Sequence, residues 1–346
     1  MSENLLELDR LKMHFPITGG VMLKQVAAVK AVDDVSLFIR PGETLGLVGE
    51  SGCGKSTLGK CAVRLNRPTS GSVRFDGQDI TRAGASKLRE IRRNMQMIFQ
   101  DPAESLDPRM SVRAIVEEAF AIHKIGTRKE RYAKVATLLD RVGLPGSAID
   151  KFPFEFSGGQ RQRIGIARAI ALKPKLVVAD EPVSALDVSV QSQVLNLMLE
   201  LQRDMGLAYL FIAHDLAVVK HISDRVAVMY LGKIVELADA DAIYKNPKHA
   251  YTKALLSAIP TPDPSVKKDR VILEGDVPSP INPPAGSAFG HRIEHPKYDQ
   301  TIGMDLSLVE IEKDHWVAAD PCCLSDADYQ LAKGLRPSSV PSSPEA

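Results

Sequence analysis

One short segment, GESGCGKST at residues 49–57, restricts the possible folds of this chain more than any other part of the sequence. An almost wholly apolar stretch precedes it and a helical pattern runs from Lys55 to Leu65, so the segment joins a buried strand to a helix. Glycines let backbone N–H groups wrap around a phosphate, and the N-terminus of the helix favours negative charge. The pattern predicts a phosphate-binding loop of Gly49, Glu50, Ser51, Gly52, Cys53, Gly54, Lys55, Ser56 and Thr57.

The side chains of this loop suit a nucleoside triphosphate and its metal ion. Lys55 can neutralise the β/γ oxygens, Ser56 can offer its hydroxyl to Mg²⁺, and Thr57 can reach the α-phosphate. Cys53 fills a position that the pattern leaves free, so we expect a small, non-catalytic filler. The alternative is a glycine-rich turn before an ordinary helix, which the strand before the loop and the helix after it disfavour.

Strands alternate with helices over most of the chain. Apolar, β-rich stretches at 31–39, 175–180 and 208–214 are separated by helical patterns. This alternation predicts an α/β protein with a parallel sheet, in which residues 101–156 form a helical insertion. From about Pro260 the sequence becomes rich in proline, and a small C-terminal domain is expected after it.

Composition and charge restrict the cellular location and the binding partners that we expect for the protein. The 346 residues carry a net charge of +1 with no long run of one sign, which gives nucleic-acid binding no general support. The four cysteines lack the spacing of a disulfide framework or a zinc site, and the N-terminus lacks the order of a signal peptide. No apolar run reaches the roughly 18 residues of a membrane span. A cytosolic protein, peripheral if it works at a membrane, is expected.

An acidic pair follows the apolar strand of LVVADEP, residues 176–182. Asp180 ends the strand, where its carboxylate can hold Mg²⁺ through water, and Glu181 can polarise an attacking water as a general base. A solvated turn is the alternative interpretation of such a pair. The phosphate-binding loop upstream favours the metal and water roles.

Between these two elements lies FSGGQRQR, residues 156–163, just before a helical pattern. A hydroxyl, glycine amides and a helix N-terminus make an anion site. Together with the other motifs, this segment resembles the signature of the ATP-binding cassette (ABC) ATPases, whose P-loop core has a mixed sheet, flanking helices and a helical subdomain. The resemblance implies contact with the γ-phosphate held by a partner subunit, made by Ser157, Gly158, Gly159 and Gln160.

Other positions match the same family one by one. Gln100 in FQDP resembles the glutamine that senses Mg²⁺ and water and links the helical subdomain to the core, and Asp187 in SALD resembles the aspartate at the dimer seam. His214 in FIAHD resembles the histidine that contacts the γ-phosphate, although a lone histidine after a strand is more often structural. Phe15 resembles the aromatic residue that stacks on adenine, and a core residue is the alternative.

Three further stretches resemble the oligopeptide/dipeptide import group of this family: ESLDPRM, KHAYTKALLSAIP and LEGDVPSPINPPAGSAF. The resemblance implies an ABC ATPase domain at 1–259, a transporter-type C-terminal extension at 260–335, and a tail at 336–346 that we expect to be disordered. It also implies three kinds of partner: a second ATPase subunit (a paralogue or the same chain), two transmembrane permease subunits and an extracytoplasmic solute-binding protein. The chain itself would be peripheral, on the cytoplasmic face of the cell (inner) membrane. The group also transports nickel, some sugars and opine-like compounds, so the substrate stays open.

The C-terminal extension departs from its group. Many members hold an iron–sulfur cluster there, but Ser287, Ile293, Ile302 and Ala319 occupy the places expected for its cysteines. Only two adjacent thiols lie nearby, which cannot supply the four ligands of a cluster, so we expect none. We interpret His291, His295 and His315, which are scattered among polar residues, as ordinary surface histidines.

Two other functions remain as alternatives. A soluble ABC ATPase acting on nucleic acid or ribosomes commonly carries two cassettes, a zinc site or a coiled-coil insertion, and this sequence has one cassette and a neutral charge. A regulatory subunit that binds ATP without turnover would tend to lack Glu181 or His214. The leading hypothesis is therefore the ATPase subunit of an importer.

Overall fold

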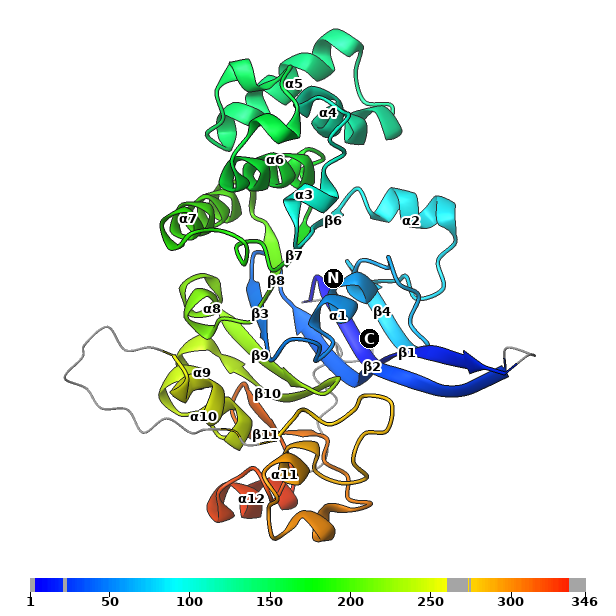
Figure 1. Cartoon of the computed structure of the whole chain (residues 1–346), viewed down its shortest axis with the longest axis vertical. Coiled ribbons are helices and arrows are strands. Elements are labelled where there is room, and N and C mark those ends of the chain that lie inside the picture. The colour runs from blue at the N-terminus through cyan, green and yellow to red at the C-terminus, as the bar shows by residue number, and fades with distance from the viewer. Residues whose placement is uncertain (1–3, 21–23, 260–272, 274, 336–346) are drawn as a thin grey trace, which may run out of the picture. The chain divides into compact units, whose positions relative to one another are not determined.

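A computed structural model describes residues 4–20, 24–259, 273 and 275–335 (Figure 1). The chain divides into two compact units. The first comprises Met1–Arg40, Thr44–Arg82 and Ala213–Ala346, and the second Pro41–Glu43 and Ala83–Ile212, each as far as it is described. The tail predicted to be disordered, 336–346, lies outside the described residues.

The first unit contains two sheets. A four-stranded antiparallel sheet has the order β2-β1-β4-β5, and five further strands run in the order β11-β12-β10-β9-β3, with β3 and β9 parallel. The strands are β1 (Leu6–Gly19), β2 (Lys24–Ile39), β3 (Thr44–Val48), β4 (Ser70–Phe75), β5 (Gln78–Asp79), β9 (Arg225–Tyr230), β10 (Lys233–Asp239), β11 (Leu308–Glu312) and β12 (His315–Ala318). The helices are α1 (Lys55–Ala62), α8 (Leu216–Ile222), α9 (Ala240–Lys245), α10 (Ala250–Ser257), α11 (Ala288–Arg292), the short η3 (Tyr298–Thr301) and α12 (Asp326–Lys333).

The second unit combines three parallel strands, in the order β8-β7-β6, with most of the longer helices. Every residue of β7 (Leu176–Asp180) and β8 (Ala208–Ala213) is buried, as the continuous apolar runs predict for a parallel sheet covered on both faces. The remaining elements are α2 (Ala85–Ile91), β6 (Met95–Ile98), α3 (Pro102–Ser105), α4 (Val112–Ile122), α5 (Arg128–Arg141), η1 (Gly146–Ala148), η2 (Pro153–Glu155), α6 (Gly158–Ile170) and α7 (Val188–Met205). This mixed α/β architecture confirms the predicted fold class.

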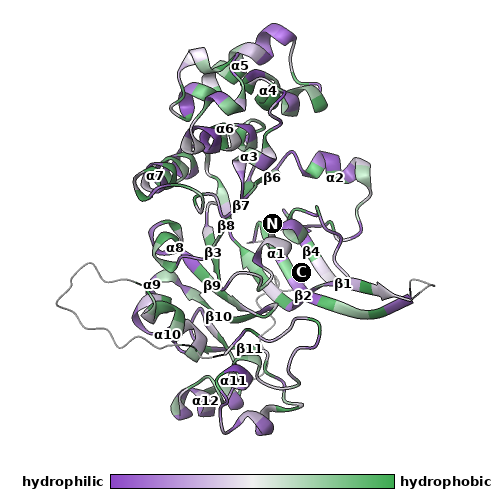
Figure 2. Cartoon of the chain, in the orientation of Figure 1, coloured by the Kyte–Doolittle hydropathy of each residue, from purple (hydrophilic) through white to green (hydrophobic). Residues whose placement is uncertain are grey.

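Local sequence signals account for several element ends. The capping box of Thr127 and Glu130 begins α5, and Gly206, in the left-handed conformation with φ 64°, ends α7. In Figure 2, α4, α5 and α6 carry both hydrophobic and hydrophilic residues, as amphipathic helices do. None of the helices in the described ranges is long and apolar enough to cross a membrane.

The C-terminal hairpin of β11 and β12 extends the sheet of the first unit. Strand β12 pairs with β10, with Glu236 opposite Val317. The interpretation of His315 as a surface residue is wrong: its side chain is buried at the start of β12 and its Nε2 lies 2.8 Å from a carboxylate oxygen of Glu236. The polar residues around it in sequence lie in a turn, whereas pairing with β10 brings His315 into the interior.

Candidate nucleotide-binding site

The predicted phosphate loop lies between β3 and α1 and closes around the side chain of Lys55. The buried ammonium group donates to the carbonyl oxygens of Gly49 at 2.8 Å and Glu50 at 2.9 Å. The Leu58 N–H donates to the Gly54 carbonyl, which starts α1, and the Gly232 N–H donates to the Cys53 carbonyl. The loop is therefore fixed at both ends, with a lysine ammonium at its centre.

Two glycines of the loop are required by the close approach of neighbouring backbone. A Cβ atom on Gly49 would lie 2.1 Å from the carbonyl oxygen of Met229, and one on Gly54 would lie 1.9 Å from that of Ala31. Gly54 also has a φ of 107°, in the region that favours glycine. The path of this loop, which a phosphate cradle needs, is thus available only to glycine at these two positions.

Three further loop residues, Cys53, Ser56 and Thr57, are wholly or partly buried. The Cys53 side chain is buried, and burial raises the pKa of its thiol, which is therefore protonated at neutral pH. Ser56 and Thr57 are half-buried in the first turn of α1. A hydroxyl at that place suits a hard cation such as Mg²⁺, which prefers oxygen ligands.

The structure brings Gln100 and Glu181 together in the second unit. The parallel strands β6 and β7 are neighbours, and Gln100 and Glu181 follow the ends of these strands. The Gln100 Nε2 donates to the Glu181 Oε2 at 3.0 Å. Asp180, the last residue of β7, is buried, whereas Glu181 is half-buried and has a φ of 44°. A non-glycine residue in this conformation is strained, a feature that is concentrated at functional sites.

The glycine-rich SGGQ segment forms the N-terminus of α6. Ser157 and Gln160 make a capping box: the Ser157 Oγ accepts from the Gln160 N–H, and the Gln160 Oε1 accepts from the Ser157 N–H. A Cβ on Gly159 would lie 2.4 Å from the Val190 Cγ1, because α7 packs closely there. The other three residues of the segment, Ser157, Gly158 and Gln160, are exposed. An exposed, capped helix N-terminus of this kind suits an anion.

Asp187 is exposed at the N-terminus of α7. The turn before it is held by Gln191, whose Nε2 donates to the carbonyl oxygens of Val183 at 3.1 Å and Leu186 at 2.9 Å. The loop of SALD is therefore fixed from the helix that follows it, with its aspartate facing solvent.

His214 and Phe15 are both exposed and both belong to the first unit. His214 directly follows β8, and the next residue, Asp215, caps α8. Phe15 lies in β1 opposite Val29 with 38% of its surface exposed, so the alternative of a core residue is wrong. The first unit thus carries the phosphate loop, Phe15 and His214, and the second carries Gln100, Asp180, Glu181, the SGGQ segment and Asp187.

Sequence reasoning missed two side chains that hold the phosphate loop. The Tyr251 hydroxyl of α10 accepts from the Glu50 N–H at 2.9 Å, and the Arg292 guanidinium of α11 donates to the Glu50 carboxylate at 2.7 Å. They lie 201 and 242 residues from Glu50 in sequence, so no local pattern connects them with the loop.

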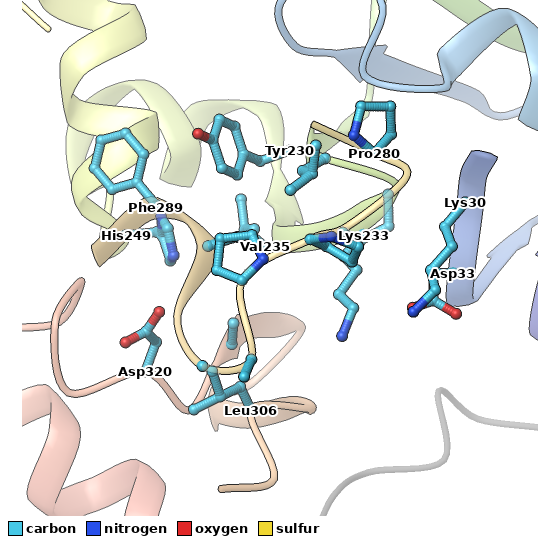
Figure 3. Close-up of a pocket in the computed structure, with 18 residues that line it drawn as sticks. Lys30, Asp33, Tyr230, Lys233, Val235, His249, Pro280, Phe289, Leu306 and Asp320 are labelled. Carbon is cyan, nitrogen blue, oxygen red and sulfur yellow. The ribbon is translucent and has the colours of Figure 1, made fainter. Parts of the chain in front are cut away.

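One buried group of side chains resembles a metal site but is better explained by hydrogen bonds. Donor atoms of His249, Asp320 and Cys323 lie within 4.8 Å of one another, and Figure 3 shows His249 and Asp320 at one end of a cavity of about 320 Å³. The His249 Nδ1 accepts from the Tyr251 N–H, which leaves the proton on Nε2. A metal-bound histidine instead donates through its second nitrogen. The Asp320 Oδ2 accepts from Ser287 and from the Cys323 thiol, and its Oδ1 accepts from the Cys322 N–H, so both oxygens are already engaged.

Comparisons with known proteins agree with the α/β core and with the glycine-rich loop before α1. A model of the "ABC transporter" family matches residues 32–184, and one described as "Oligopeptide/dipeptide transporter, C-terminal region" matches residues 235–295. The chain belongs to the ABC transporter family, as an ATP-hydrolysing subunit of the group with the oligopeptide/dipeptide C-terminal region.

Relatives of known designation agree with this assignment. The oligopeptide transport ATP-binding protein AppF of Bacillus subtilis (strain 168) is 56% identical over 293 residues, covering 84% of this chain and 89% of the relative. OppF of the same organism is 58% identical over 78% of this chain and 87% of its own length. A solved dimer of the ATP-binding cassette MJ0796, bound to ADP and Pi, has a TM-score of 0.61 at 26% identity and covers 68% of this chain and 98% of that one.

Proposed function

We propose that this chain hydrolyses ATP to drive uptake of oligopeptides or dipeptides across a membrane. The observation that carries the proposal is its similarity along most of its length, C-terminal region included, to relatives designated as oligopeptide transport ATP-binding proteins. Nickel, some sugars and opine-like solutes are the other substrates that the group takes.

The loop residues and the acidic pair would supply the chemistry. Lys55 would bind the β/γ oxygens. Ser56, Gln100 and (through water) Asp180 are the residues that would each offer oxygen to Mg²⁺, an ion that would supply positive charge against the phosphates. The oxygen donors of these three side chains fit that ion. Glu181 acts as general base toward a water that Gln100 helps to orient, and the 3.0 Å contact between them supports this pairing. His214 contacts the γ-phosphate, and Phe15, exposed on β1, stacks on adenine.

The complete site would need two ATPase subunits arranged head to tail. The exposed segment Ser157–Gln160 would face the phosphate loop of a partner, and Asp187 would lie at the seam between them. The solved relative bound to ADP and Pi is a dimer, which supports this arrangement. Binding of two Mg-ATP molecules would close the dimer, and hydrolysis would reopen it.

The chain would couple this cycle to two permease subunits and an extracytoplasmic binding protein, from the cytoplasmic face of the membrane. Residues 1–259 would be the ATPase domain, 260–335 the transporter-type extension, and 336–346 a disordered tail. The helical segment 101–156 would receive a short permease helix near Gln100. The relatives' designation as transport proteins supports these partners.

Affinity purification of the tagged full chain from detergent-solubilised cells tests this proposal against the nucleic-acid alternative. We expect membrane proteins with many spanning helices to co-purify, in a ratio of two ATPase chains to two permease chains. Matched purification after nuclease treatment serves as the control. Recovery of RNA or ribosomal proteins, with no membrane protein present, would support the alternative and contradict an importer.

A further inference from the structure

Glu50, the second residue of the phosphate loop, is held through all three of its polar groups. Its N–H donates to the Tyr251 hydroxyl at 2.9 Å, and its carbonyl accepts from the Lys55 ammonium at 2.9 Å. Its carboxylate accepts from the Arg292 Nη1 at 2.7 Å. Two of these three partners belong to the part of the chain that follows the nucleotide-binding motifs.

Arg292 is built into this contact rather than resting on the surface. It ends α11, and only 7% of its side chain is exposed. Its Nε donates to the Gly275 carbonyl at 3.3 Å. Burial lowers the pKa of Arg292, but the Glu50 carboxylate and the Tyr230 hydroxyl outweigh burial and raise it above its usual range. The guanidinium is therefore charged at every physiological pH, and the ion pair is charge-assisted.

The aromatic residues behind the contact make it rigid. Tyr230, Tyr251 and Phe289 pack together with ring centroids 4.7 Å, 5.4 Å and 5.5 Å apart. Figure 3 shows Tyr230 and Phe289 close together beside the cavity. Because Phe289 and Arg292 share the short helix α11, the same cluster that supports Tyr251 also fixes the position of the guanidinium.

The charge of Glu50 is a problem for a loop that must accept a triphosphate. A carboxylate close to the phosphates would repel them unless a cation neutralised it. We propose that Arg292 is a positioning residue of the nucleotide site, which neutralises the Glu50 carboxylate so that the phosphate loop can accept ATP. The inference rests on the proposed phosphate loop and assigns the C-terminal extension a direct part in nucleotide binding.

The extension does not depend on this ion pair for its attachment. Strand β12 pairs with β10, and the buried His315 contacts Glu236. Lys248 bonds to Glu312 at 2.7 Å and to Asp328 at 3.3 Å. Loss of the Arg292 charge should therefore leave the extension folded and attached, and its effect should be seen at the nucleotide site.

Four variants of the full chain distinguish neutralisation of Glu50 from a docking contact, meaning one that only attaches the extension to the loop. They are R292M, E50Q, E50Q/R292M and the control K297M. Lys297 forms an exposed 2.8 Å pair with Asp326 within the extension, away from the loop. Affinity for a fluorescent ATP analogue is measured in EDTA and again with Mg²⁺, and thermal unfolding is recorded for each variant. We expect R292M to bind about tenfold more weakly, equivalent to ~1.4 kcal/mol, and K297M to bind as wild type.

The Glu50 variants carry the decisive comparison. Neutralisation predicts that E50Q/R292M recovers most of the affinity lost in R292M, because no carboxylate is then left for Arg292 to neutralise. A docking contact predicts that E50Q weakens binding as R292M does, and this result would overturn the inference even if R292M failed to fold. Wild-type affinity in R292M would also overturn it. If K55M bound nucleotide as wild type does, the proposed phosphate loop itself would be wrong.

Discussion

Replacing Gly54 with alanine should damage the phosphate loop more than the same change at Gly52. Both residues have positive φ, 107° and 78°, so an alanine at either would carry a strain of about 1–2 kcal/mol. At Gly52 the new Cβ meets nothing within 4 Å, but at Gly54 it lies 1.9 Å from the Ala31 carbonyl oxygen. Contacts under 3.0 Å are essentially never seen, so loop and strand must separate by about 3.0 − 1.9 = 1.1 Å.

The size of the effect follows from that displacement. Overpacking against fixed backbone adds about 1–3 kcal/mol to the strain, giving a total of about 2–5 kcal/mol for G54A against 1–2 kcal/mol for G52A. A shift of about 1 Å in groups that position a substrate can lower the reaction rate on the order of 100-fold, so such sites are sensitive to displacements of this size. We therefore expect nucleotide affinity to fall at least tenfold further in G54A than in G52A.

The assay is binding of a fluorescent ATP analogue to the full chain, with urea unfolding of each variant as the measure of stability. Gly42, with a φ of 73° and nothing within 4 Å of its Cβ, lies outside the loop, so G42A measures strain alone. Equal affinities and equal unfolding free energies for G54A and G52A would refute the reasoning, because the close approach of Ala31 would then place no restriction on the residue at position 54.

Three further predictions concern a buried acid, a helix cap and the thiols of the phosphate loop and α1. Burial raises the pKa of Glu236, but hydrogen bonds from His315 and from the backbone N–H groups of Lys248 and His249 help to lower it below 4.5 overall. Its contribution to stability is therefore full above pH 4.5 and is lost as the pH falls through the folded-state pKa. Unfolding free energy measured from pH 7 to pH 3 should therefore depend less on pH in E236Q than in wild type, and equal slopes would contradict this. S157A removes the cap of α6 and should lower the free energy of unfolding in urea by about 1 kcal/mol. S157D keeps a capping side chain and should largely avoid this loss. Burial raises the pKa of Cys61 to about 12 and that of Cys53 above its usual range, so an aromatic disulfide reagent at pH 8 should label these thiols only after unfolding, and rapid labelling of the native chain would contradict their burial.

The parts that sequence predicted well are those whose physics is local. The buried strands β7 and β8 appear as continuous apolar runs, and the loop before α1 appears as a spacing of glycines and lysine. Arg292 could not be predicted, because it reaches Glu50 across 242 residues of sequence. The burial of His315 could not be predicted from its sequence, because polar residues precede it and its burial depends on the pairing of β12 with β10.

The most direct test of the central claim, that this site hydrolyses ATP with Glu181 as the general base, is single-turnover hydrolysis by E181Q. Glutamine keeps the shape of the side chain and can still accept from the Gln100 amide, but it cannot take a proton from water. We predict a fall of about 100-fold or more in the rate of phosphate formation, with ATP affinity retained. Hydrolysis by E181Q at the wild-type rate would contradict the account.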